Sequence, residues 1–157
     1  MILVITGTNG APFDRLLAQV DRLEGAEPVV VQHGPSEIRP RGAECIAYLP
    51  FDDLVDRIRQ ARVVVTHGGV GTVLLTLMNE RKPIVVPRLA RFGEAVDDHQ
   101  LPFARRLEER GSIVCLPDLG RLPETVAAAA GEWQPADRPG ARGLGRELER
   151  YLRGMAA

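Results

Sequence analysis

Short apolar runs alternate along the chain with segments of helical hydrophobic spacing, and this alternation restricts the folds that the chain can adopt. The apolar runs, rich in Val, Ile and Leu, occupy residues 2–5, 29–31, 63–65, 84–86 and 113–116. Runs this short are typical of strands that are buried on both faces of a sheet. Another short strand is expected near residues 45–47, after a stretch that contains Pro and Gly.

Between these runs, apolar side chains recur three and four positions apart, which is the spacing of one face of a helix. The segments with this spacing cover residues 13–23, 54–58, 73–78 and 103–107. Strands that alternate with helices need crossover connections, and these build a parallel sheet. We therefore predict an α/β fold, a Rossmann-like doubly wound parallel sheet, whose ligands bind beyond the carboxyl ends of the strands.

The length of 157 residues corresponds to one domain with a sizeable core. We expect this domain to span residues 1–134. Residues 135–157 are expected to form a linker and an amphipathic helix, near residues 144–153, that packs on the domain or on a partner. No apolar run approaches the ~20 residues that cross a bilayer, and no basic segment precedes the first run, so a cytoplasmic protein is expected.

Charge and cysteine content exclude several classes of function. The 20 Lys and Arg residues are balanced by 21 Asp and Glu residues, which leaves no basic field for a nucleic-acid partner. Cys45 and Cys115 are far apart and lack the spacing of a disulfide framework or a zinc cluster. The three histidines form no metal-binding pattern with them, so we expect neither a metal ion nor another cofactor.

The first predicted strand ends in a turn of small residues, Thr-Gly-Thr-Asn-Gly at residues 6–10, before a helix. Backbone N–H groups at such a turn, together with the positive end of the helix dipole, suit a phosphate. The residues expected to line this turn are Gly7, Thr8 and Asn9. The turn lacks the spacing of a dinucleotide fingerprint or a P-loop, and similar turns also serve only to pack a strand against a helix.

The most specific motif is Thr-His-Gly-Gly-Val-Gly-Thr at residues 66–72, between a predicted strand and a predicted helix. Its glycines remove side chains from the junction, so that a diphosphate can approach the backbone amides closely. An imidazole and a hydroxyl can point at the same ligand. The alternative is that the glycines and the histidine serve packing alone. The residues expected at the ligand are His67, Gly68, Gly69, Val70, Gly71 and Thr72.

A polar set follows the fourth apolar run. Arg88 ends that run, Glu94 lies in the next loop, and Asp98, His99 and Gln100 stand at the start of the next helix. Side chains of these types can bond the hydroxyls of a sugar. Capping of the helix by a neighbouring aspartate is the competing explanation.

Together these motifs resemble the nucleotide-sugar half of GT-B glycosyltransferases, the family 28 C-terminal (MurG-like) domain. The resemblance rests on the first turn, on the glycine motif and on residues 82–88, 92–94 and 96–100, and it covers about residues 1–116. A complete GT-B enzyme has two lobes. Since this chain is long enough for one lobe and begins at its first strand, the resemblance implies a stand-alone donor-binding lobe.

Lobes of this kind are similar to two groups of subunits. One is the catalytic subunit of the split dolichol-diphosphate N-acetylglucosamine transferase, and the other is the bacterial exopolysaccharide subunit of the PssE type, to which residues 87–100 are closer. This likeness implies a membrane-anchored, acceptor-binding partner of PssD type, which recruits the chain to the inner face of the membrane. Leu75 departs from the family, which places a ribose-binding Glu at that position.

The resemblance implies an inverting, metal-independent transfer of a sugar from a UDP-sugar to a lipid-diphosphate-linked saccharide. The amides of the glycine motif and of the first turn then stabilise the charge on the departing UDP. If the sugar is glucuronate, Arg88 or Arg91 is expected to pair with its carboxylate. The catalytic candidates are His67, beside the diphosphate, and His33 or Glu94 as the base, unless the partner supplies the base.

Two other functions stay open at this point. One is a non-catalytic nucleotide-sugar-binding or regulatory module, and the other is a UDP-N-acetylglucosamine transferase subunit. The complete set of donor-site residues favours an active enzyme. An oxidoreductase is disfavoured because no acidic residue closes a GxGxxG unit.

Overall fold

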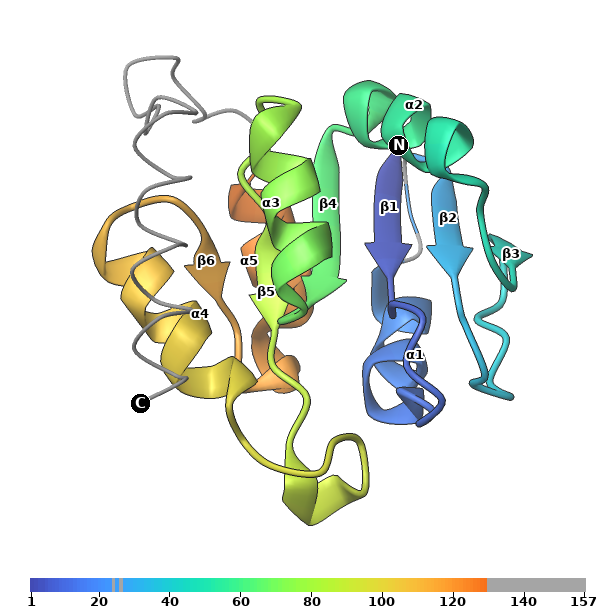
Figure 1. Cartoon of the computed structure of the whole chain (residues 1–157). Helices are drawn as coiled ribbons and strands as arrows, with labels where there is room; N and C mark the ends of the chain where they lie inside the picture. Colours follow the sequence, from blue (N-terminus) through green and yellow to red (C-terminus); the bar gives the residue numbers. More distant parts are fainter. Residues whose placement is uncertain (24, 26, 130–157) are drawn as a thin grey trace.

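Six parallel strands form one sheet in the computed structural model, which describes residues 1–23, 25 and 27–129 (Figure 1). The strands are β1 (Ile2–Ile5), β2 (Val29–Gln32), β3 (Ala43–Ile46), β4 (Val63–His67), β5 (Ile84–Val86) and β6 (Val114–Cys115). Their order across the sheet is β3-β2-β1-β4-β5-β6. The predicted doubly wound parallel sheet is therefore confirmed.

Helices cover both faces of the sheet. They are α1 (Asp14–Val20), α2 (Phe51–Gln60), α3 (Val70–Met78), α4 (Gln100–Glu109) and α5 (Leu122–Ala128), with short 3-10 turns η1 (Asp21–Leu23), η2 (Ala90–Phe92) and η3 (Leu119–Arg121). In Figure 1, α2, α3 and α4 lie on one face, and α1 and α5 lie on the other. Within the described part of the chain, no helix has the length and apolarity needed to cross a membrane.

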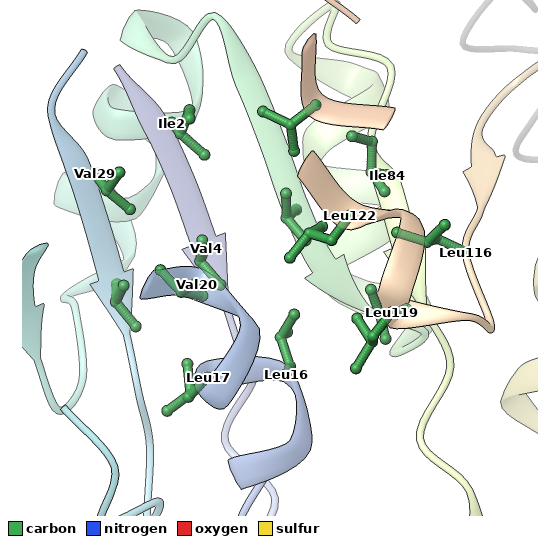
Figure 2. Packing of buried hydrophobic residues seen from close by; sticks show 14 of the residues in the cluster. Ile2, Val4, Leu16, Leu17, Val20, Val29, Ile84, Leu116, Leu119 and Leu122 are labelled. Atoms are coloured by element: carbon green, nitrogen blue, oxygen red, sulfur yellow. The ribbon is translucent and has the colours of Figure 1, made fainter. Parts of the chain in front are cut away.

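Alternate residues of each central strand point to opposite faces, and both faces are apolar. Ile2 and Val4 pack with Leu16 and Leu17 of α1 and with Leu122 of α5 (Figure 2). On the opposite face, Leu3 and Ile5 pack with Ile58 of α2, while α3 and α4 cover β5. Each of these fully buried side chains contributes about 1.5–3 kcal/mol, which explains why such short apolar runs suffice to fix the strands.

The sequence pattern placed most elements correctly and missed one helix. The strand near Cys45 lies at 43–46 instead of 45–47, and the last strand is shorter than the predicted run 113–116. The helix α5 was not expected, although Leu122 and Val126 stand four positions apart and Pro123 occupies its first turn. The predicted domain boundary at residue 134 and the predicted helix near 144–153 lie outside the described residues.

The order of strands fixes where a ligand can approach. The chain winds outward from β1 through β2 to β3, and then returns to place β4 on the other side of β1. The loops that follow β1 and β4 therefore diverge to opposite faces. In doubly wound sheets, the crevice in which ligands bind lies between such loops, beyond the carboxyl ends of the strands. Both predicted small-residue motifs follow these two strands.

Candidate functional site

The candidate site is built from three loops at the carboxyl edge of the sheet. They follow β1, β4 and β5, and they contain residues 6–13, 67–70 and 87–99. The third loop, which carries η2, extends beyond the edge of the sheet in Figure 1. These loops hold nearly all of the residues that the sequence motifs singled out.

His67 ends β4, and its imidazole is enclosed by two glycines from different loops. A Cβ atom on Gly7 would lie 2.5 Å from Cε1 of the ring, and a Cβ atom on Gly69 would lie 2.8 Å from Cδ2. Real Cβ atoms do not approach this closely, so both positions need glycine. Gly7 also has a φ of 87°, a left-handed conformation that glycine adopts without strain. Two glycines that the motif assigned to ligand approach thus also make room for the histidine.

Burial keeps the His67 imidazole neutral. The residue is 8% exposed, and desolvation, reinforced by the positive charge of Arg88, lowers its pKa from 6.5 to about 4. A backbone hydrogen bond with Ile5 acts in the opposite direction. Near neutral pH the ring can therefore hold a hydrogen bond but carries no charge that would attract a phosphate.

The first turn of α3 is the most open part of the glycine motif. Gly69 is the N-cap, and no side chain of the described residues caps the helix. The N–H groups of a first turn have no partner within the helix, and they lie at the positive end of its dipole. Gly71 is exposed, and a Cβ atom added there would meet nothing within 4 Å. Thr72 is half-buried beside it. This turn can accept an anion without displacing any protein group.

The loop after β1 meets the glycine motif at His67, against whose ring Gly7 lies. Thr8 and Asn9 are exposed, and the side-chain oxygen of Asn9 accepts a hydrogen bond from the amide of Ala11 at 2.9 Å. Phe13, which is fully buried, anchors the end of the loop, and its amide donates to Oγ of Ser36 at 2.7 Å. Neither Phe13 nor Ser36 was among the predicted site residues.

Gln100, the first residue of α4, is hydrogen bonded to backbone amides of two of the three loops. Its side-chain oxygen accepts hydrogen bonds from the amides of Gly68 and of Arg88, both at 3.0 Å, and the residue is 6% exposed. A Cβ atom on Gly68 would lie 2.8 Å from Cβ of Gln100, so this glycine is also needed for packing. The oxygen that was expected to hold a sugar hydroxyl is therefore already engaged within the protein.

Arg88 is fully buried, which corrects the expectation that it pairs with a donor carboxylate. Its guanidinium donates to the backbone oxygens of Thr6, Ala11, Pro12 and Glu94 at 2.8–3.1 Å. A side chain held by four carbonyl groups cannot turn to a ligand. The arginine that remains exposed in this loop is Arg91, whose guanidinium lies over the ring of Phe92.

Glu94 is likewise not free to act as a base. It is 3% exposed, and its carboxylate accepts hydrogen bonds from Nε and Nη2 of Arg15 at 2.8 and 2.9 Å and from the amide of Leu89 at 3.0 Å. Both carboxylate oxygens are thus engaged by the guanidinium of Arg15, and one of them also by a backbone amide. Arg15, which also bonds the backbone oxygen of Pro87, is a functional-site residue that its sequence position in a predicted helix did not reveal.

Asp98 and His99 are exposed at the outer end of the third loop. Asp98 accepts a hydrogen bond from the amide of Ala90 at 2.7 Å, and His99 pairs with Asp97. The side chain of Asp97 accepts a hydrogen bond from the amide of His99, the residue before α4, at 3.0 Å, so the capping explanation holds for this aspartate. Of the polar set predicted here, these two side chains remain accessible to a ligand.

His33 and Leu75 belong to elements next to the three loops. His33 follows β2, is 6% exposed, and its Nδ1 lies 2.8 Å from the backbone oxygen of Gly34. Its strand is separated from β4 by β1, and the next residue, Gly34, lies against Gly7 of the loop after β1. Leu75 packs with the apolar cluster under α2. Among the described residues, no group of three or more His, Cys, Asp or Glu side chains could hold a metal ion.

Comparisons with known proteins agree with these motifs. The family model described as Glycosyltransferase family 28 C-terminal domain matches residues 1–129. Two curated relatives are both named UDP-N-acetylglucosamine--N-acetylmuramyl-(pentapeptide) pyrophosphoryl-undecaprenol N-acetylglucosamine transferase. The protein from Rhodospirillum rubrum is 34% identical over 92 residues, which cover 59% of this chain and 23% of the relative. The protein from Aromatoleum aromaticum is 31% identical over 144 residues, which cover 82% of this chain and 39% of the relative.

Solved structures of GT-B glycosyltransferases share the fold. The glycotransferase of kitacinnamycin superposes with a TM-score of 0.65 and 22% identity, over 95% of this chain and 39% of that chain. The MurG protein of Acinetobacter baumannii gives a TM-score of 0.56 and 21% identity, over 81% of this chain and 40% of that chain. The chain thus spans less than half of each relative. The family match over most of the chain, together with the glycine motif at the expected strand end, shows that this chain belongs to the glycosyltransferase family 28 C-terminal domain family.

Proposed function

We propose that this chain is the donor-binding catalytic subunit of a two-subunit, inverting glycosyltransferase, which transfers a sugar from a UDP-sugar to a lipid-diphosphate-linked saccharide. The observation that carries the proposal is the uncapped first turn of α3, which is open at Gly71. The exposed Thr8 and Asn9 belong to the neighbouring loop after β1. A diphosphate placed there gains amide hydrogen bonds and a favourable helix dipole without a metal ion.

The chemistry requires stabilisation of the charge that develops on the departing UDP. Fixed amides at the α3 turn stabilise this charge because they need no reorganisation during the reaction. The neutral His67 ring orients the loops, since a ring enclosed by Gly7 and Gly69 cannot move toward the acceptor. Glu94 is bonded to Arg15 and His33 lies beyond β1, so we propose that the partner supplies the base.

The donor that we propose first is UDP-N-acetylglucosamine, the sugar nucleotide in the names of both curated relatives. UDP-glucuronate is the second candidate. Burial of Arg88 removes one of the two arginines on which it depended, and the exposed Arg91 is the one that remains for a donor carboxylate.

The partner in this proposal is a membrane-anchored, acceptor-binding subunit of PssD type, in exopolysaccharide biosynthesis at the inner face of the cell membrane. The chain covers 23% and 39% of the two curated relatives, which supports a second part that binds the acceptor. A non-catalytic nucleotide-sugar-binding module is the alternative from another class.

The test is transfer of labelled sugar to a lipid-diphosphate-linked saccharide, measured for the chain alone and with the co-expressed partner. We expect transfer only with both subunits and loss of transfer in Gly71→Trp. The matched control is Met78→Trp on the same helix, where the native side chain is already 68% exposed. Robust transfer by the lone chain would refute the two-subunit proposal. Binding of UDP-sugars without any transfer would instead support the non-catalytic module.

A further inference from the structure

Arg88 is the largest fully buried side chain among the described residues, and it lies directly under the candidate site. Burial of a guanidinium is costly unless its donors find acceptors. Four backbone oxygens accept hydrogen bonds from the guanidinium. The centroid of the Phe13 ring lies 4.6 Å from the guanidinium carbon. Nε has no partner among the described residues.

Within the described part of the chain, no carboxylate is hydrogen bonded to this cation. The nearby carboxylate of Glu94 bonds Arg15 instead, and Glu94 offers Arg88 its backbone oxygen. Burial lowers the pKa of Arg88, while the charge of Glu94 raises it. Carbonyl dipoles and an aromatic face therefore hold a buried positive charge that a direct ion pair does not cancel.

The acceptors of Arg88 flank the loop that faces the crevice. Thr6 precedes Gly7, whereas Ala11 and Pro12 follow the exposed residues Thr8 and Asn9. The guanidinium thus fixes both ends of this segment and ties it, through Glu94, to the loop after β5. Its charge also reaches the ring of His67, which lies against Gly7 and Gly69.

We propose that Arg88 is a positioning residue for a bound nucleoside diphosphate: it holds the Thr6–Pro12 loop against the Leu89–Glu94 loop and supplies a buried positive charge beneath the crevice. This inference rests on the proposed function, because it takes a nucleoside diphosphate as the ligand. The residue acts through the backbone and through its charge, without contact with the sugar.

The test compares Arg88→Met, Arg88→Lys and the control Arg62→Met. Arg62 bonds Glu27 and the backbone oxygen of Val126 at the opposite edge of the sheet, so its loss affects folding without reaching the crevice. Affinities for UDP and UMP are measured by calorimetry on the folded full-length variants. The pKa of His67 is followed by NMR as a readout that needs no nucleotide.

We expect Arg88→Met to weaken the binding of UDP at least about tenfold. The binding of UMP should weaken less, because UMP lacks the second phosphate on which the lost charge also acts. Arg88→Lys keeps the positive charge but has fewer N–H donors for the four backbone oxygens. It should therefore retain part of the UDP affinity that Arg88→Met loses. The pKa of His67 rises above about 4 in Arg88→Met and changes less in Arg88→Lys. Arg62→Met lowers stability and leaves all three readouts unchanged.

A folded Arg88→Met protein that binds UDP within about twofold of the wild type, with an unchanged His67 pKa, would overturn the inference. If Arg88→Met does not fold, Arg88→Lys decides, because UDP affinity equal to that of the wild type would show that the carbonyl contacts position nothing. If the wild type binds no UDP, the proposed function and the role of Arg88 toward a diphosphate both fail, while a shifted His67 pKa would still establish its electrostatic reach.

Discussion

Two loops of the site, those after β1 and β4, pack around the ring of His67. Its ring occupies a space that exists only because Gly7 and Gly69 have no side chains, and burial lowers its pKa to about 4. The glycine motif therefore has two functions at once, since Gly69 lies against the histidine ring and Gly71 faces open space.

Stability should depend on pH through His67. Its pKa is 6.5 when exposed and about 4 when folded, so the unfolded chain binds the extra proton between these values. The contribution of this residue is fully present above pH 6.5 and is lost as the pH falls toward 4, by about 3 kcal/mol at most. Urea unfolding at several pH values measures it. We expect His67→Gln to flatten this dependence, and an unchanged slope in the variant would contradict the assignment.

Two glycines of the same motif should respond differently to alanine. In Gly69→Ala the new methyl group overlaps the His67 ring, which should cost about 1–3 kcal/mol. In Gly71→Ala the methyl group meets nothing within 4 Å, and alanine favours a helix by up to about 1 kcal/mol relative to glycine. Urea denaturation of both proteins checks this. Equal losses of stability would show that the ring is not enclosed as described.

At the scale of elements, the loop after β5 is held by buried polar contacts to its neighbours. Gln100 at the start of α4 bonds the amides of Gly68 and Arg88, and Arg15 from α1 bonds Glu94. Helices from both faces of the sheet thus fix one loop at the carboxyl edge. This arrangement holds the loop in one conformation before a ligand arrives.

Loss of the Gln100 acceptor should destabilise the loop strongly. Gln100→Leu leaves two buried N–H groups without a partner, at a cost of about 2–4 kcal/mol. Gln100→Glu keeps an acceptor oxygen near the Arg88 charge and should recover most of this loss. The exposed Gln60 in α2 provides the control, and Gln60→Leu should change stability by less than about 0.5 kcal/mol. A Gln100→Leu protein as stable as the control would contradict the account.

The sequence predicted the elements better than it predicted the roles of polar side chains. Short apolar runs identified the strands because burial on both faces leaves few other residue choices. The motif around Arg88, Glu94 and Gln100 located the right loop, yet these side chains bond backbone groups and Arg15. A motif marks constrained positions, but only the fold shows whether a ligand or the buried backbone imposes the constraint.

At the scale of the whole molecule, the two edges of the sheet differ in character. The carboxyl edge presents open loops and the uncapped α3 turn, whereas at the amino edge Glu27 pairs with both Arg62 and the amino group of Met1. These ion pairs lower the pKa of Glu27 to about 2, with Arg62 as the larger cause. At the carboxyl edge, the first turn of α3 offers amide donors and a positive dipole end to a ligand that carries negative charge.

The most direct test of this account is an NMR titration of the isotope-labelled chain with UDP. We predict saturable shifts that concentrate on the amides of Gly7–Asn9 and of Gly69–Thr72, and their loss in Gly71→Trp but not in Met78→Trp. These amides are the groups that the open turn and the facing loop offer to a diphosphate. Shifts confined to other parts of the molecule, or no shift at any UDP concentration, would contradict the claim that this edge binds the donor.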